Sequence, residues 1–290
     1  MHHNDEQSNA GSGQRLHDRL QLIESLKEAD ISTKISIRDL RKDFRNNAGG
    51  TTVALQNINL SIQDGEFFCI VGPSGCGKST LLRIIADLDT YTSGEVDIAH
   101  ADAKRPLTSM VFQEHALYPW MTVLDNAAFG LEMDGRSRPD RYAKVRPLLE
   151  KVGLTRFADY YPHQLSGGMR QRTSLVRAFV TDPEVLLMDE PFAALDAQNK
   201  IMLQGELMRI WEENRQSVIF ITHSIDEALL LGDRIAIMSS SPGQLTEIID
   251  VPFARPRNLF DIQSDPEFSR IARHVWNVLE KEVRRGRAEG

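Results

Sequence analysis

The sequence is poor in features that would point to several common classes of protein. Its 290 residues include only two cysteines, Cys69 and Cys76. These have neither CxxC spacing nor a histidine at a zinc-ligand spacing, so a disulfide framework and a zinc site are both disfavoured. The formal charge is −7, from 34 basic and 41 acidic residues, with no strongly basic block. The footprint expected of a nucleic-acid-binding protein is therefore missing.

Long apolar runs are scarce as well. The longest, such as residues 67–71 and 185–188, fall far short of the roughly 20 residues that a membrane-spanning helix needs. The opening residues, MHHNDEQSNAGSG, have neither a cationic start nor an apolar run, so we expect no secretory signal and a cytoplasmic chain. With 41% hydrophobic and 26% charged residues, the chain has the composition of a globular protein with a sizeable core.

Changes in sequence pattern divide the chain into three parts. Residues 1–33 are expected to be an extension, disordered to about residue 14 and then carrying a short amphipathic helix. In residues 34–254, an antiparallel β region is followed by short, continuous apolar runs that alternate with helical patterns. Such runs are typical of a parallel sheet covered on both faces. A helical insertion is expected at about 114–172, and residues 255–290 are predicted to form an extension with one helix, which begins at Asp265 and Pro266 and ends before Gly286.

A phosphate-binding loop is predicted between the apolar strand at residues 67–71 and the helix that follows. The segment matches G-x-x-x-x-G-K-[ST], and its glycines would turn backbone N–H groups toward phosphate oxygens at a helix N-terminus. Lys78 is predicted to reach the β- and γ-phosphates of ATP, and Ser79 to offer its hydroxyl to Mg²⁺. The position of Cys76 beside Lys78 predicts a thiol that favours the thiolate form. The predicted ATP-binding residues of this loop are Gly72, Pro73, Ser74, Gly75, Cys76, Gly77, Lys78, Ser79 and Thr80.

A second apolar strand, residues 185–188, ends in two carboxylates, Asp189 and Glu190. Ligands of open α/β sheets gather at the carboxyl ends of the strands. Asp189 is predicted to associate with Mg²⁺, and Glu190 to orient or deprotonate the attacking water. Together with the phosphate loop, this pair predicts binding and hydrolysis of Mg-ATP.

The segment LSGGMRQR, residues 165–172, precedes an amphipathic helix and lies upstream of the Asp189 strand. Here the sequence resembles the ATP-binding cassette (ABC) family, and this form of the motif is similar to that in the nitrate, sulfonate and taurine importer group. The usual signature is LSGGQ, so Met169 departs from it, as does Asp87 from an expected glycine. Other landmarks occur in the family's order along the chain: Phe44, which matches the aromatic that stacks on adenine although Tyr is commoner there, Gln113, Ala194-Leu195-Asp196 and His223.

Over about residues 34–251 the resemblance implies an α/β phosphate-loop NTPase cassette. It would have a mixed, mostly parallel sheet core, an antiparallel β subdomain and a helical subdomain. The resemblance also implies a homodimer in which the partner's Ser166, Gly167 and Gly168 complete each ATP site. Ala194, Leu195 and Asp196 would form a dimer-interface loop. Gln113 would contact the metal and the γ-phosphate, His223 the γ-phosphate, and the implied catalytic set is Glu190, His223 and Gln113.

The function implied is that of the ATPase subunit of an importer for small oxyanions of the nitrate, sulfonate or taurine type. It would sit at the cytoplasmic face of the cell membrane with an integral membrane permease and, indirectly, a periplasmic or extracellular substrate-binding protein, without nucleic acid. Residues 117–126 look like the segment that faces the permease, with packing inside the helical lobe as the alternative.

Two other classes of function are weighed against the importer. A soluble ABC ATPase of nucleic-acid repair or translation usually has paired cassettes or long coiled-coil insertions, and neither is evident here. A stand-alone phosphotransferase or GTPase would need an acceptor pocket or a guanine-reading NKxD motif, but Asn199-Lys200 is followed by Ile-Met.

Overall fold

The computed structural model describes residues 32–45 and 50–289, with side chains to residue 286. The chain divides into a unit of residues 1–33 and a unit of residues 34–290. The second unit contains the whole of the predicted cassette and the extension after it. The amphipathic helix predicted near residues 16–26 lies outside the described residues.

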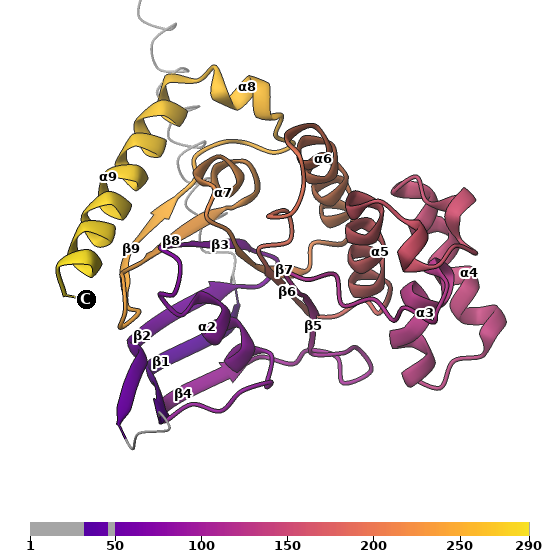
Figure 1. Ribbon diagram of the computed structural model, residues 1–290, viewed down its shortest axis with the longest axis horizontal. Coiled ribbons are helices and arrows are strands. Elements are labelled where there is room, and N and C mark those ends of the chain that lie inside the picture. The colour runs from indigo at the N-terminus through magenta and orange to yellow at the C-terminus, as the bar shows by residue number, and fades with distance from the viewer. Residues whose placement is uncertain (1–31, 46–49, 290) are drawn as a thin grey trace, which may run out of the picture. The chain divides into compact units, whose positions relative to one another are not determined.

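The centre of this second unit is a six-stranded sheet with the order β5-β6-β7-β3-β8-β9 (Figure 1). Five strands run parallel to their neighbours, and only β9 is antiparallel, to β8. The mixed, mostly parallel sheet of the prediction is thus confirmed. Its strands are β3 (Phe67–Val71), β5 (Thr108–Val111), β6 (Val185–Asp189), β7 (Ser217–Ile221), β8 (Arg234–Met238) and β9 (Leu245–Asp250).

The inner strands are buried on both faces because each face meets a different hydrophobic core. In β3, Phe67, Cys69 and Val71 point into a core shared with the helices, whereas Phe68 and Ile70 point into a core shared with the β subdomain. Side chains alternate between the two faces of a strand, so an unbroken apolar run is what such a position requires.

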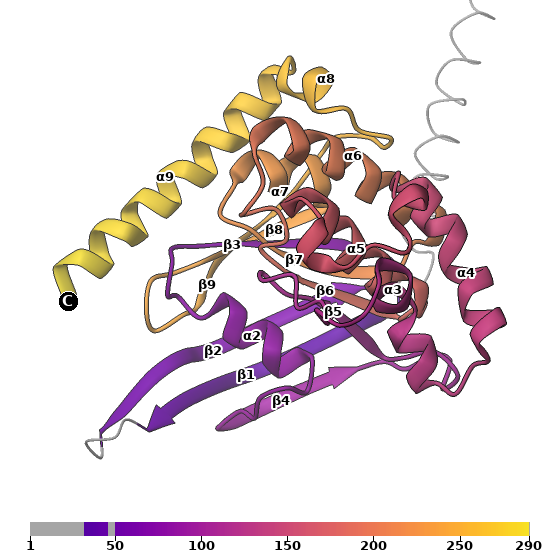
Figure 2. The ribbon, with the colours of Figure 1, turned by 45° about the vertical axis from the view of Figure 1, so that its right-hand side comes forward.

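The β subdomain is a three-stranded sheet with the order β2-β1-β4, in which β1 (Thr33–Arg45) pairs antiparallel with β4 (Ser93–Ile98). Strand β2 (Thr51–Gln63) supplies alternating buried residues from Ile58 to Ile62. Helix α2 (Lys78–Ile85) packs in the same core, and Figure 2 shows it between the two sheets. The antiparallel region was predicted from this alternation, but β4 was not, because its residues are mostly exposed.

The helical subdomain is formed by α3 (Val123–Met133), α4 (Arg138–Lys151) and α5 (Gly167–Val180). Residues 114–172, where the sequence predicts a strand-poor, helical insertion, contain no strand. Each of the three helices begins at a side-chain cap, from Thr122, Ser137 and Ser166 respectively. A hydroxyl at this position accepts a hydrogen bond from a backbone N–H group that the helix leaves without a partner.

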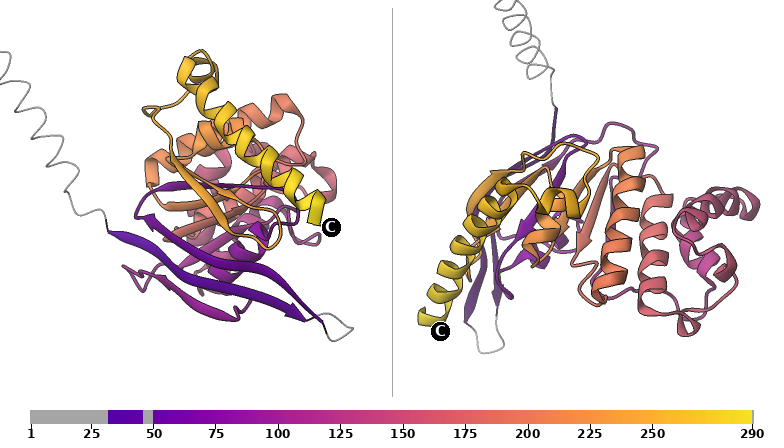
Figure 3. Two further views of the ribbon diagram at one scale, coloured as in Figure 1. Left: turned by 90° about the vertical axis from the view of Figure 1, so that its left-hand side faces the viewer. Right: turned by 90° about the horizontal axis from the view of Figure 1, so that it is seen from above.

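The remaining helices cover the β8 and β9 end and one face of the main sheet (Figure 3). They are α6 (Ala197–Asn214), α7 (Ile225–Leu231), α8 (Leu259–Gln263) and α9 (Pro266–Glu289). The prediction of one helix after residue 254 was incomplete, because α8 precedes α9. Helix α9 begins as predicted, with Asp265 Oδ1 accepting from the Glu267 N–H at 2.8 Å, but it continues past Gly286. In the described part of the chain, no helix is long and apolar enough to span a membrane.

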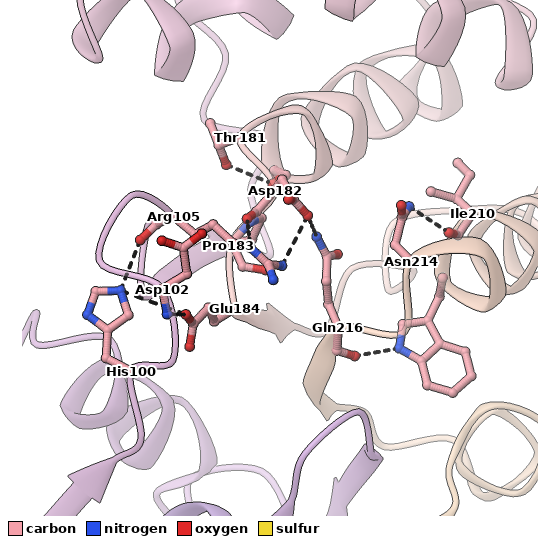
Figure 4. Close-up of polar contacts among 12 residues, drawn as sticks. His100, Asp102, Arg105, Thr181, Asp182, Pro183, Glu184, Ile210, Asn214 and Gln216 are labelled. Carbon is pink, nitrogen blue, oxygen red and sulfur yellow. Dashed lines mark hydrogen bonds and ion pairs between the residues drawn. The ribbon is translucent and has the colours of Figure 1, made fainter.

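A polar cluster joins the β4–β5 loop to the start of β6 (Figure 4). Glu184 is paired with Lys34 from β1 and accepts hydrogen bonds from the N–H groups of Ala101 and Asp102, at 3.0 and 2.6 Å. Arg105 pairs with Asp182 at 3.1 Å. This cluster fixes the end of β6 opposite to the one that carries Asp189.

Candidate nucleotide-binding and hydrolysis site

The predicted phosphate loop lies between β3 and α2. Its lysine is held by the loop itself, because Lys78 Nζ donates to the carbonyl oxygens of Gly72 and Pro73, both at 2.9 Å. Gly75 and Gly77 have positive φ values of 79° and 98°. Glycine adopts this left-handed region readily, which explains its use in the loop. The loop is therefore shaped by its own backbone and its own lysine.

A glycine that sequence reasoning missed packs against this loop. A Cβ atom on Gly243 would come 2.1 Å from the carbonyl oxygen of Cys76, a distance that no side chain tolerates. Gly243 is also tied to β2, since its N–H donates to Ala54 O and its carbonyl accepts from the Gln56 N–H, both at 2.9 Å. The segment after β8 thus packs against the backbone of the phosphate loop at Cys76. No short motif marks Gly243.

Two of the three predicted metal-associated residues, Ser79 and Asp189, lie in contact. Ser79 Oγ donates to Asp189 Oδ1 at 2.9 Å. Burial raises the pKa of Asp189, and the neighbouring charge of Glu190 raises it further, against lowering effects from the Ser79 hydrogen bond and from Lys78. A divalent cation beside Asp189 would offset both the desolvation and the repulsion.

Glu190 and His223 also lie together. His223 Nδ1 is 3.3 Å from Glu190 Oε2. Glu190 has a positive φ of 45°, a region that costs most residues about 1–3 kcal/mol. Its backbone is held there by a hydrogen bond from its N–H to Ile221 O at 3.0 Å and another from the Ala193 N–H to its carbonyl at 3.2 Å. The strained backbone points this carboxylate at the edge of the sheet where ligands gather.

Gln113 lies at the same edge but contacts neither carboxylate. Strand β5 pairs with β6 so that Val111 lies opposite Met188, which places Gln113 at the level of Glu190. Its side chain is exposed. Within the described residues, no hydrogen bond joins it to Ser79, Asp189 or Glu190, so its contact with a metal stays a prediction.

The signature segment lies at the N-terminus of α5. Ser166 caps this helix by accepting from the Met169 N–H at 3.3 Å. Gly168 lies near Leu195 and Asn199, so the signature adjoins the residues 194–196 that precede α6. Asp196 caps α6, accepting from the Asn199 N–H at 3.0 Å. In the part of the chain that the structure covers, no hydrogen bond links residues 166–168 to the phosphate loop of the same subunit.

The two departures from the family pattern have physical explanations. Met169 is half-buried and packs against the main core, a place that suits a thioether. Asp87 has a positive φ of 57° and follows the end of α2. The N–H groups of Asp87 and Leu88 bond the carbonyls of Ile84 and Arg83, at 3.1 and 2.8 Å, which is the pattern of a Schellman cap. Glycine usually occupies this position, and aspartate is among the few residues that tolerate it.

Phe44 is 43% exposed near the end of β1. Lys42 Nζ lies 4.7 Å from the centre of its ring and is fixed by Asp89 Oδ1 at 2.6 Å. One side of the ring therefore carries a cation, and the exposed remainder of the ring can stack on a base.

The prediction that Cys76 favours a thiolate was wrong. Burial raises the pKa of the Cys76 thiol, and the opposing effect of Lys78, whose Nζ lies 3.8 Å from Sγ, is smaller. The side chain is 1% exposed. Proximity to Lys78 was readable from the sequence, but the packing that removes water from the sulfur was not.

The loop between β3 and α2, the paired carboxylates at the end of β6 and the signature segment at α5 together define the class of the protein. The sequence matches the family described as ABC transporter over residues 55–193. Two relatives that are 44% and 41% identical match 87% and 84% of the chain, so the chain belongs to the ABC transporter family. It is an ATP-binding cassette with ATPase activity, as the sequence predicted.

Three similar proteins are ATP-binding proteins of the same family. An uncharacterized ABC transporter ATP-binding protein of Methanocaldococcus jannaschii is 44% identical over 255 residues, 87% of this chain and 94% of that protein. The nitrate import ATP-binding protein NrtD of Synechocystis is 41% identical, over 84% of this chain and 94% of that protein. The aliphatic sulfonates import ATP-binding protein SsuB of Bacillus thuringiensis is 44% identical, over 77% of this chain and 88% of that protein.

Solved structures agree on the fold. The dimeric, post-hydrolysis state of the ATP-binding cassette MJ0796 bound to ADP and Pi matches with a TM-score of 0.67 at 32% identity. The match covers 76% of this chain and 100% of that one. The predicted cassette fold, with its β and helical subdomains, is thereby confirmed.

Proposed function

We propose that this cassette powers the import of a small oxyanion, of the nitrate or sulfonate type, through a separate membrane permease. The observation that carries the proposal is the gathering of Lys78, Ser79, Asp189, Glu190 and His223 at one edge of the sheet, in a chain whose similar proteins are named as nitrate and aliphatic sulfonate import subunits. These transport names favour an importer over a soluble repair or translation ATPase. The binding partner of the oxyanion would be a separate periplasmic or extracellular protein.

In the proposed mechanism, the loop of Gly72 to Thr80 holds the phosphates of ATP. Lys78 exchanges its two carbonyl partners for the β- and γ-phosphates, and the exposed ring of Phe44 stacks on adenine. Glu190 orients the attacking water and accepts its proton, while His223 contacts the γ-phosphate from the next strand.

The residues present fit a bound Mg²⁺. A hydroxyl and a carboxylate that lie 2.9 Å apart, Ser79 and Asp189, are oxygen donors of the kind that Mg²⁺ prefers. No cluster of three acidic, histidine or cysteine ligands occurs in the described residues. This agrees with an ion held largely by phosphate oxygens and water, with Gln113 as a further contact. When bound, the ion would neutralise charge on the β- and γ-phosphates.

The ATP sites would be completed in a homodimer. Ser166, Gly167 and Gly168 present a hydroxyl and backbone N–H groups at the start of a 14-residue helix, an arrangement suited to an anion. In the described structure no hydrogen bond joins them to the phosphate loop of their own subunit. We therefore assign the ATP of the partner subunit as their ligand. The dimeric state of the similar cassette MJ0796, bound to ADP and Pi, supports the proposal of a dimer.

The permease would dock on an aromatic cluster of the helical subdomain. Trp120 is 70% exposed. Tyr118 lies 5.5 Å from Trp120 and 4.6 Å from Phe129, measured between ring centres. The buried Asn126 fixes this segment by bonding both the N–H and the carbonyl of Tyr118, at 2.8 and 3.1 Å. A preorganised, exposed aromatic suits a protein interface, and the exposure of Trp120 disfavours the alternative of internal packing.

Hydrolysis and coupling are tested with separate variants. Glu190→Gln should bind ATP with wild-type affinity but nearly abolish turnover, because it keeps the shape of the site and removes the base. A variant with more than half of wild-type turnover would remove Glu190 from this role.

For coupling, the tagged chain is purified from membranes of its own cells, and the integral membrane protein that accompanies it is reconstituted with it in liposomes together with the substrate-binding protein of the same system. We expect oxyanion-dependent stimulation of ATPase activity that is lost in Trp120→Ala. Trp276→Ala, at a tryptophan that is 60% exposed on α9, is the matched control and should behave as wild type. An ATPase that no membrane partner stimulates would contradict the importer.

A further inference from the structure

A buried carboxylate lies behind the loop that carries His223. Glu227 is in the first turn of α7, and its side chain is 5% exposed. Thr222 Oγ1 donates a hydrogen bond to Glu227 Oε2 and accepts one from the Ser224 N–H at 3.0 Å. Ser224 Oγ in turn accepts from the Glu227 N–H at 3.4 Å. The residues on both sides of His223 are therefore held by Glu227.

The other oxygen of this carboxylate connects to a different loop. Lys200 Nζ lies 2.5 Å from Glu227 Oε1, as an ion pair without hydrogen-bond geometry. Lys200 is in the first turn of α6, where its N–H donates to Asp196 O at 2.9 Å. Glu227 thus joins the His223 loop to the helix that begins at residues 194–196. The Thr222 N–H also bonds Ile70 O at 3.1 Å, which ties the same loop to the strand before the phosphate loop.

The side chain of His223 has little support of its own. It is 59% exposed, and among the described residues its side chain makes one polar contact, with Glu190 at 3.3 Å. The direction of the imidazole therefore depends on the backbone of residues 222–224. A buried carboxylate must be paired and hydrogen-bonded to be retained, and both conditions are met here by groups from two elements near the site.

We propose that Glu227 is a positioning residue for ATP hydrolysis. It fixes His223 through Thr222 and, through Lys200, transmits displacements of residues 194–196 to His223. The inference rests on the role of His223 in the proposed function and on the dimer-interface role that the family resemblance implies for residues 194–196. A purely structural ion pair is the competing explanation, and it predicts lower stability with no specific effect on turnover.

The primary test is Glu227→Gln in the full chain, assayed with Mg-ATP. The amide keeps an acceptor for Thr222 but loses the charge that pairs with Lys200. We expect kcat to fall roughly tenfold or more, because small displacements of a catalytic group are costly, while the KM for ATP stays within about twofold. The matched control is Glu66→Gln, which removes the charge of another buried ion pair, with Arg234 at 3.2 Å. It should lower thermal stability without changing kcat.

Two further measurements separate positioning from stability. In a His223→Ala background, Glu227→Gln should cause no further loss of kcat, because both changes act through one side chain. Thr222→Val should lower kcat, whereas Thr222→Ser, which keeps the hydroxyl, should restore it. Additive losses in the double variant, or a Glu227→Gln enzyme with wild-type kcat, would overturn the proposal.

These outcomes are independent of the importer assignment. Failure to find a stimulating permease would leave the effect of Glu227 on basal turnover intact. Conversely, an unchanged kcat in Glu227→Gln would refute the inference even in a chain that couples to its permease.

Discussion

Glu184 offers a quantitative test of how the β subdomain is joined to the main sheet. Its side chain is 2% exposed and is paired with Lys34, which is 4% exposed. Burial alone would raise the pKa of this carboxyl, but the Lys34 hydrogen bond and the N–H groups of Ala101 and Asp102 lower it from 4.5 to about 2. A lowered pKa of this size corresponds to about 3 kcal/mol of stability at neutral pH.

The perturbation is Glu184→Gln, which leaves Lys34 buried without a counter-charge. We expect a loss of about 3–5 kcal/mol in the free energy of unfolding at pH 7, measured by urea denaturation. The double variant Lys34→Met with Glu184→Gln should recover at least about 1 kcal/mol, since it removes the unpaired charge. Glu280→Gln is the control, because Glu280 pairs with Arg284 on the surface and should contribute under about 0.5 kcal/mol.

The pH dependence has a definite sign. Because the folded-state pKa is below the unfolded one, the contribution of Glu184 is fully present above pH 4.5 and is lost as the pH falls toward 2. The stability advantage of wild type over Glu184→Gln should fall to about half near pH 3.3. A variant within about 1 kcal/mol of wild type at pH 7, or a difference that does not shrink below pH 4.5, would show that the charge of Glu184 does not stabilise the fold.

Three other variants have expected outcomes. Lys78→Ala should weaken equilibrium ATP binding about 10- to 100-fold, because a charged hydrogen bond contributes about 1.5–3 kcal/mol, and unchanged affinity would contradict the phosphate-loop assignment. Ser166→Arg should leave ATP binding by the monomer intact and block hydrolysis, and mixed dimers with Lys78→Ala subunits would show whether each site is shared. Asp87→Gly should raise the free energy of unfolding by about 0.5–1 kcal/mol with unchanged ATPase activity, because it relieves the positive φ of 57°; a lower melting temperature would argue against strain at this position.

The main sheet was predictable, and the phosphate loop could be proposed from the sequence, because the signals of both are local. An apolar strand such as residues 67–71 is buried on both faces, so every residue in it carries the signal. The phosphate loop is a contiguous segment whose residue types follow from contact with phosphate. Strands β4 and β9 were missed because they are edge strands with exposed faces, and α8 was missed because five residues are too few to show a helical period.

Features that depend on packing between distant segments were not predictable. The environment of Cys76 is set partly by Gly243, which lies far along the chain and carries no motif. The same holds for Glu227, whose partner Lys200 belongs to another helix. A single sequence shows which residues have useful chemistry, but it does not show which of them lie in contact in the folded chain.

The strand order has a consequence for the synthesis of the protein. Strand β3, which ends at the phosphate loop, lies between β7 and β8, and Ile70 pairs with Ile221. The ribosome must add roughly 150 residues after β3 before either neighbour exists, which takes roughly 8–30 s at about 5–20 residues per second. During that interval five consecutive apolar residues have no sheet to join. The nascent chain therefore presents an apolar, unpaired strand well before the ATP site can form.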